Sequence, residues 1–318
     1  MKFGKVDDPS AIDFNIPADD AAIKEILKNG TDASFEVYIG CAKWNKTDLK
    51  DFYPKGTKDE LIYYAQQFNS IEMNSLFYNM PKDEQVVKWK NKTPEGFKFF
   101  PKITQSISHM RRLDNVEELT KIYCDAISHF EEKLGICFLQ LHENFGLKEF
   151  DKLKEFVAYF PKVIPLAVEV RSKEWYLDKD IWNEYCNFLK THGTANVIVD
   201  TAGRRDMMHM RLTTPTAFIR FVGCNADETD YKRIDDWVDR IVQWKDSGLE
   251  QLCFFVHQNV EKSSPLFSAY LIEKLNSKLN LGLHIPKMSI DHSATLHPHR
   301  HINTEQFHSF FDGQSDIF

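Results

Sequence analysis

The sequence lacks the features that mark secreted, membrane-spanning and disulfide-stabilised proteins. Its first residues contain no apolar core of a secretory signal, and no stretch approaches the roughly 18 consecutive apolar residues of a membrane span. The six cysteines are scattered without a CxxC pair, which argues against a zinc knuckle or a redox dithiol. We therefore expect a cytoplasmic protein without disulfides and without a membrane partner.

An excess of positive charge is also missing. The formal net charge is −7, so the molecule as a whole does not attract nucleic acid or anionic lipid. The P-loop, GxGxxG, HExxH and GxSxG motifs are absent as well. These absences argue against a nucleotide hydrolase, a dehydrogenase, a zincin and a serine esterase, but not against enzymes whose groups are spread over several strands.

What the 318 residues contain is an alternation of short apolar runs and amphipathic segments. The runs are mostly continuous, as in parallel strands that helices cover on both faces. Between them apolar residues recur at helical spacing, as from Val116 to Phe130. The predicted strands cover residues 35–40, 70–74, 97–102, 136–141, 165–170, 195–200, 217–222 and 252–257.

This alternation predicts an α/β fold, a (β/α)8 TIM-type barrel. An open doubly wound sheet is the alternative, but no Gly-rich first turn supports it. We expect residues 1–34 to form an N-terminal arm packed on the barrel, 35–279 the barrel, and 280–318 a polar, His-rich C-terminal tail. For the HPHRH run at 297–301, adventitious metal uptake is favoured over a physiological metal site.

Polar side chains gather at the predicted carboxyl ends of the strands, where barrels of this kind bind their ligands. A neutral polar group buried there without a partner costs about 2–7 kcal/mol. These side chains must therefore find hydrogen-bond partners in one another, in water or in a ligand. The predicted catalytic carboxylates are Glu72, Glu169 and Asp200. The predicted ligand-binding residues are Trp44, Asn74, Lys102, His109, Gln140, Arg171, Arg220 and His257.

This set of residues allows more than one chemical interpretation. Its lysine and arginines favour a ligand that carries phosphate or carboxylate. The structural alternative is an internal ion-pair network that closes the barrel mouth. No cofactor is predicted, and a divalent metal is a minority hypothesis because nearby cations compete for the carboxylates. Its four ligands would be Glu72, Glu169, Asp200 and His257.

Many short segments, in order, resemble the YecE-like family, the domain of unknown function 72. Among them are IGCAKW at 39–44, AVEVRSKEW at 167–175 and VIVDTAG at 197–203, and the resemblance spans residues 35–276. It implies a (β/α)8-type barrel and a rim built from the residues named above other than His257, but it supplies no reaction. The sequence departs from the family pattern, which indicates a divergent subgroup, at Cys41-Ala42-Lys43, His142, Val222 and His257-Gln258.

Three functions fit these observations. We favour an enzyme, a hydrolase or lyase, that acts on a small anionic substrate with a carboxylate as general base. Cationic side chains would then stabilise developing negative charge. The second function is a metal-dependent nuclease-like or nucleic-acid-binding barrel, which the acidic net charge opposes. The third is a non-catalytic ligand-binding protein.

Overall fold

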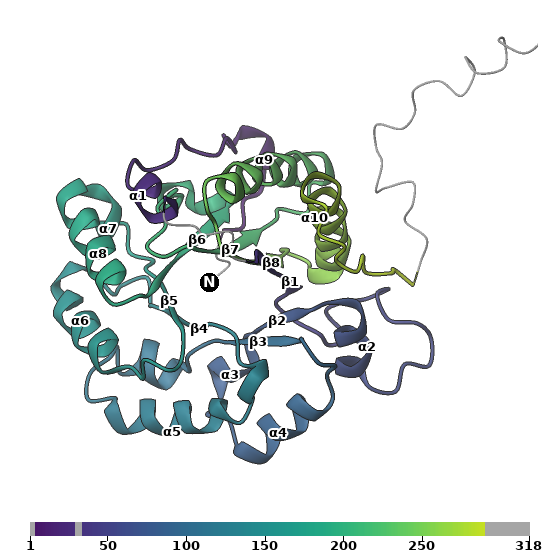
Figure 1. Cartoon of the computed structure of the whole chain (residues 1–318), viewed down its shortest axis with the longest axis horizontal. Helices are drawn as coiled ribbons and strands as arrows, with labels where there is room; N and C mark the ends of the chain where they lie inside the picture. The colour runs from purple at the N-terminus through teal and green to yellow at the C-terminus, as the bar shows by residue number, and fades with distance from the viewer. Residues whose placement is uncertain (1–3, 29–33, 290–318) are drawn as a thin grey trace, which may run out of the picture.

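Parallel strands curl around a central axis and helices cover their outer side (Figure 1). The structure is a computed structural model, and it describes residues 4–28 and 34–289. The strands are β1 (Glu36–Cys41), β2 (Ser70–Met73), β3 (Lys98–Pro101), β4 (Cys137–Gln140), β5 (Leu166–Glu169), β6 (Ala195–Thr201), β7 (Thr216–Val222) and β8 (Gln251–His257). The helices are α1 (Ile23–Leu27), α2 (Glu60–Gln67), α3 (Ser75–Tyr78), α4 (Asp83–Asn91), α5 (Glu117–Ser128), α6 (Phe150–Tyr159), α7 (Glu174–Leu177), α8 (Lys179–Thr191), α9 (Asp227–Asp246) and α10 (Ser264–Leu279).

The strands form two hydrogen-bonded sheets. Six strands pair in the order β1-β8-β7-β6-β5-β4, and β2 pairs with β3. Isolated parallel bridges, Phe99 with Leu134 and Lys102 with Phe138, connect β3 to the β4 side. The predicted α/β class is confirmed, with the eight-stranded barrel reduced to a strongly curled six-stranded parallel sheet and a two-stranded partner. The alternative of an open doubly wound sheet does not describe this curl.

Side chains join β1 to β2 where no strand ladder does. The Asn69 amide accepts a hydrogen bond from the Ile39 N–H at 3.1 Å and donates one to the Val37 carbonyl at 2.7 Å. The two strands approach closely at Gly40, where an added Cβ would lie 2.2 Å from the Ser70 carbonyl oxygen. The Tyr64 hydroxyl adds a second link, because it accepts a hydrogen bond from the Cys41 N–H at 2.7 Å and donates one to the Ser70 carbonyl at 3.0 Å. Two side chains and a close approach at one glycine therefore join the strands at this seam.

Two-residue alternation sorts each strand into an inner and an outer face. The inner face carries a buried cluster that includes Phe100, Phe138, Ala167, Phe218 and Phe255, while the outer residues pack against the helices. Each of these five inner residues is followed, two positions later, by a polar side chain on the same face. These polar residues are Lys102, Gln140, Glu169, Arg220 and His257.

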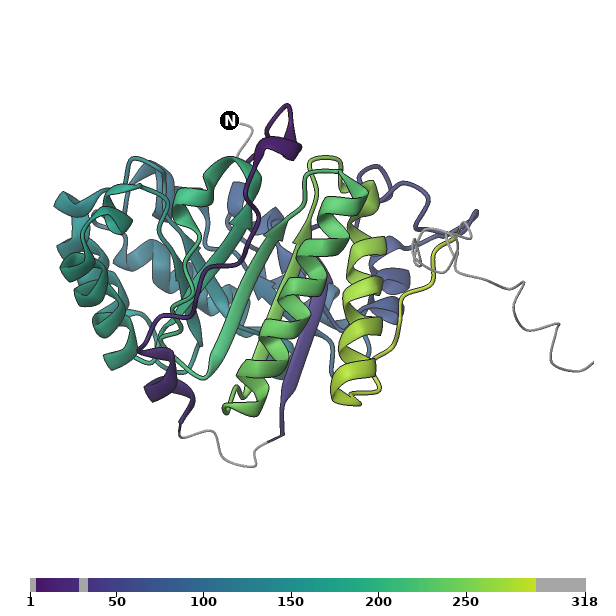
Figure 2. The ribbon, with the colours of Figure 1, turned by 90° about the horizontal axis from the view of Figure 1, so that it is seen from above.

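The N-terminal arm runs along β6 and α9 from one end of the strands to the other (Figure 2). Gly4 lies at the carboxyl end of β6, where its carbonyl accepts a hydrogen bond from the Gly203 N–H at 3.1 Å. Farther along, Arg240 donates to the Pro17 carbonyl at 3.1 Å, and Arg211 pairs with Asp20 at 2.8 Å.

Within the described parts of the chain, no helix has the length and apolar character needed to cross a bilayer.

Candidate functional site

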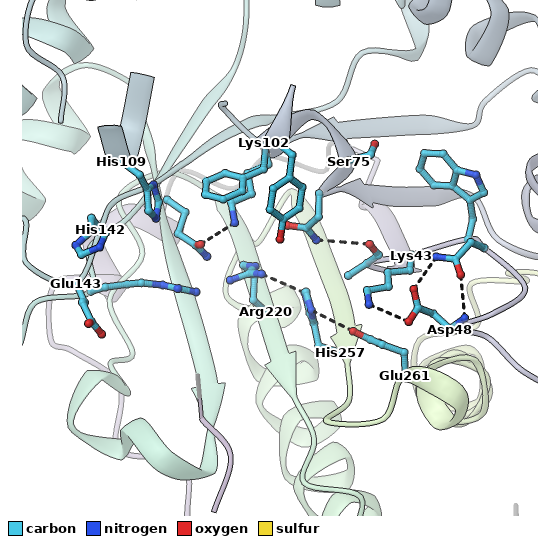
Figure 3. Close-up of a pocket in the computed structure, with 18 residues that line it drawn as sticks. Lys43, Asp48, Ser75, Lys102, His109, His142, Glu143, Arg220, His257 and Glu261 are labelled. Carbon is cyan, nitrogen blue, oxygen red and sulfur yellow. Dashed lines mark hydrogen bonds and ion pairs between the residues drawn. The ribbon is translucent and has the colours of Figure 1, made fainter. Parts of the chain in front are cut away.

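A pocket of about 810 Å³ opens at the carboxyl ends of the strands (Figure 3). This volume lies within the usual range for small-molecule sites. The eight residues predicted to bind a ligand all line it: Trp44, Asn74, Lys102, His109, Gln140, Arg171, Arg220 and His257. The structure therefore brings together side chains that lie more than 200 positions apart in the chain.

Arg220 lies at the floor of the pocket between two buried carboxylates. Its Nε and Nη2 donate to the Glu72 carboxylate at 2.9 and 3.0 Å, and its Nη1 donates to Glu169 at 2.7 Å. A guanidinium that contacts a carboxylate through two nitrogens makes one of the strongest protein ion pairs. Glu72 and Glu169 are essentially without solvent exposure, so Arg220 supplies charge compensation that water cannot.

Glu169 has two further partners on the pocket side. Arg171 Nε donates to it at 2.6 Å, and the Gln140 amide nitrogen lies 3.0 Å from both carboxylate oxygens. Burial alone would raise the pKa of Glu169, but Arg171 and Arg220 outweigh burial and lower it to about 2. Glu169 is therefore ionised, with its acceptor sites engaged.

Glu72 is held in the same manner. Asn74 donates to it at 2.6 Å, and His257 Nε2 lies 3.1 Å from its other oxygen. Burial would raise the pKa of Glu72, yet the attraction of Arg220 and His257 keeps it well below its usual value. The geometry favours a role for both glutamates in positioning arginines over one in accepting a proton from a ligand.

Lys102 differs from the arginines because no carboxylate in the described ranges forms an ion pair with it. Its Nζ donates to the Gln140 amide oxygen at 2.7 Å and lies 4.0 Å from the ring centroid of Phe77. Burial, followed by repulsion from Arg220 and Arg171, lowers the pKa of Lys102 to about 7. A lysine in this setting is either a protonated cation that lacks a counter-ion among the described residues or a neutral amine.

His109 forms part of the pocket wall next to Lys102. Its ring contacts Phe77 edge-on at 4.8 Å and His142 at 5.3 Å between centroids, and its Nδ1 lies 2.9 Å from the Ser108 hydroxyl. Burial, with repulsion from Lys102, lowers the pKa of His109 to about 3. At neutral pH His109 is therefore an uncharged hydrogen-bonding group.

The sequence prediction missed part of the opposite wall. Lys43 pairs there with Asp48 at 3.0 Å, the Asn45 amide donates to Asp48 at 2.7 Å, and Glu261 lies 3.9 Å from His257 Nδ1. These residues come from the segments that follow β1 and β8. Alternation along a strand does not extend into such segments, so no pattern in the sequence marks them.

Asp200 does not lie in the pocket, and the prediction that it joins this set was wrong. Val197 and Val199 occupy the inner face of β6, so Asp200 points outward toward α9 by the same alternation. There it accepts hydrogen bonds from Trp237 Nε1 and pairs with Arg233, both at 2.8 Å, and it also pairs with Arg205. Asp200 thus fixes α9 and the loop after β6 to the sheet.

The structure does not support the minority hypothesis of a metal held by strand-end residues. Among residues 4–28 and 34–289, no three His, Cys, Asp or Glu side chains come close enough to share a cation. Asp200 faces away from the other three proposed ligands, and arginines occupy Glu72 and Glu169. The HPHRH run lies outside the described residues.

Comparison with known proteins agrees with the resemblance found in the sequence. The chain is 26% identical over 264 residues to UPF0759 protein YecE of Escherichia coli K12, a match covering 76% of this chain and 94% of that protein. It is 26% identical over 178 residues to UPF0759 protein YunF of Bacillus subtilis, covering 52% and 60%.

Solved structures share the fold. A DUF72 family protein from Thermotoga maritima superposes with a TM-score of 0.63 at 23% identity, covering 77% of this chain and 99% of that one. A second, from Enterococcus faecalis, gives 0.62 at 20% identity, covering 78% and 99%. Residues 38–289 match the family described as "Protein of unknown function DUF72". The chain therefore belongs to the DUF72 family.

Proposed function

We propose that the pocket binds a small anionic ligand, with a carboxylate or phosphate group, beside Lys102 and Arg171. The buried pairs support this assignment, because Glu72 and Glu169 are matched in charge by Arg220 and Arg171. Lys102 is then a further positive charge with which no carboxylate of the described residues forms an ion pair. A buried cation without a counter-ion is costly. An anion that enters the pocket would supply the compensating negative charge.

The same proposal explains why the cations are arranged as they are. Glu169 fixes Arg171 through Nε at 2.6 Å, which orients the guanidinium before a ligand arrives. Gln140 ties Lys102 to Glu169 through its two amide atoms. Donors held in place before binding lose little freedom when the anion arrives.

We further propose that the eight strands act as one (β/α)8 barrel around this pocket. The two sheets meet at seams that Asn69 bridges on one side and isolated strand bridges on the other. Ligand sites of such barrels lie at the carboxyl ends of the strands. A hydrolase or lyase reaction would use the same cations to stabilise negative charge that develops on the bound substrate.

Calorimetric titration with phosphate, sulfate, malonate and lactate tests the proposed anion site. We expect at least one of these anions to bind the intact protein, and Lys102→Met to weaken that binding about 10- to 100-fold, the usual value of a charge-assisted hydrogen bond. Lys43→Met is the matched control, because Lys43 lines the same pocket but is already paired with Asp48. Failure of all four anions to bind, or an equal loss in both variants, would refute the proposal.

A further inference from the structure

We propose that Lys102 forms a Schiff base with the carbonyl carbon of a small oxo acid bound in the pocket. This inference rests on the proposed anion site and narrows its ligand to acids that also carry an aldehyde or ketone. The carboxylate would lie beside Arg171, and the carbonyl would face the Lys102 amine. Both groups line the same pocket, and Lys102 is 7% exposed.

The contacts of the Lys102 nitrogen suit a nucleophile. A neutral amine has two N–H donors and one lone pair. The Gln140 amide oxygen at 2.7 Å accepts one donor, and the face of Phe77, 4.0 Å from Nζ, accommodates the second. This leaves the lone pair for the pocket that Lys102 lines (Figure 3).

Gln140 keeps the amine apart from the nearest carboxylate. Its amide nitrogen donates to Glu169, so its oxygen is the atom presented to Lys102. A glutamate at this position would pair with the lysine and hold it protonated, whereas an amide accepts a hydrogen bond without adding charge. Gln140 is thus a neutral group at a position where a negative charge would keep the Lys102 amine protonated and unreactive.

The surrounding charges favour the same state of the amine. The charged and titratable side chains that act on it are Glu72, His109, Glu169, Arg171 and Arg220. The two glutamates are engaged by arginines, and His109 is uncharged at neutral pH because burial lowers its pKa to about 3. The pKa of about 7 for Lys102 then leaves a substantial neutral fraction at neutral pH.

The covalent step balances without an oxidant or reductant. The amine lone pair forms a bond to the carbonyl carbon, the π pair moves to oxygen, and one N–H proton passes to that oxygen. The carbon–oxygen bond then breaks as the oxygen takes a proton from solvent and leaves as water. The nitrogen lone pair completes the C=N bond, and the product is a protonated imine on Lys102.

Reductive trapping of the intact protein tests this inference. The protein is incubated at pH 7 with pyruvate, glyoxylate or 2-oxoglutarate and cyanoborohydride, then digested for peptide mass spectrometry. We expect a reduced adduct on Lys102 at least about tenfold above any other lysine, with Lys43 in the same pocket as the internal control. Lactate, which keeps the carboxylate but has no carbonyl, should suppress the adduct by competition.

The outcomes separate the two proposals. Calorimetric binding of lactate or of an oxo acid without a Lys102 adduct would overturn the Schiff base and leave the anion site standing. An adduct that lactate does not suppress would overturn the placement of the oxo acid in that site. If no adduct forms and no anion binds, both proposals fail. Lys102→Arg, which keeps the charge, should bind lactate yet give no adduct, and an adduct elsewhere in the pocket of this variant would also count against the assignment.

Discussion

Arg220 and Lys102 show how two cations in one pocket come to have different properties. Arg220 is enclosed by two carboxylates, and its pKa is raised because their attraction outweighs the effect of burial. Lys102 has an amide and a ring as its neighbours, so burial lowers its pKa. The first residue therefore stabilises the fold and the second is available to a ligand.

Replacing Arg220 by methionine should lower the free energy of unfolding by about 3–5 kcal/mol at pH 7, because it leaves Glu72 and Glu169 buried without their shared partner. Urea denaturation measures this change. The pKa of Glu169 is depressed to about 2 in the folded protein, so its contribution is present above its unfolded pKa and is lost as the pH falls. The difference in unfolding free energy between the wild type and Arg220→Met should accordingly become smaller as the pH falls from 5 to 2. An unchanged stability at pH 7 would contradict the central place given to this residue.

The ionisation of Lys102 should be visible in the pH dependence of stability. Its folded pKa is about 7, whereas an unfolded lysine has a pKa of about 10.4. Between these values the unfolded chain binds more protons, so stability rises with pH. The unfolding free energy of the wild type should therefore rise relative to that of Lys102→Met from pH 7 to pH 10. A difference that does not vary with pH would show that Lys102 titrates normally.

At the scale of elements, the junction between β1 and β2 is held by side chains and not by a backbone ladder. Elsewhere in the six-stranded sheet backbone ladders hold neighbouring strands, as between β1 and β8. Between β1 and β2, the Asn69 side chain supplies the bonds to Ile39 and Val37, and the Tyr64 hydroxyl bridges Cys41 and Ser70. A side chain can be removed by substitution, whereas a backbone ladder cannot.

Asn69→Ala should destabilise the protein by about 2–6 kcal/mol, since it leaves a donor and an acceptor of β1 unsatisfied, each at about 1–3 kcal/mol. Hydrogen exchange at the Ile39 amide should accelerate by more than the change in global stability accounts for. Asn91→Ala, at the exposed end of α4, is the matched control and should change stability by less than about 0.5 kcal/mol. Equal effects of the two variants would mean that Asn69 does not hold the seam.

Alternation along the strands explains which parts of the site were predictable. Lys102, Gln140, Glu169, Arg220 and His257 each follow an inner apolar residue by two positions, so the strand pattern alone places them on one face. Asp200 was predicted from its position at a strand end, although Val197 and Val199 already place it on the outer face. The contacts of Asp48 and Glu261 depend on how loops pack, which strand periodicity does not encode.

At the scale of the whole molecule, a net charge of −7 coexists with a pocket whose unbalanced group is a cation. The two do not conflict, because charges more than about 8 Å away are largely screened at physiological ionic strength. The eight strands were found from apolar runs, but whether neighbouring strands share a continuous ladder depends on register and on close contacts such as the one at Gly40. Such contacts arise only when distant segments meet, so the seams could not be predicted from local sequence.

Anomalous diffraction from a crystal soaked in selenate tests the central claim, that this pocket is an anion site, most directly. Selenate is a compact oxyanion whose selenium can be located independently of the protein phases. We predict an anomalous peak in the pocket, within hydrogen-bonding reach of both Lys102 Nζ and the Arg171 guanidinium, that weakens in a Lys102→Met crystal. Selenate bound at surface sites with none between Lys102 and Arg171 would contradict the account.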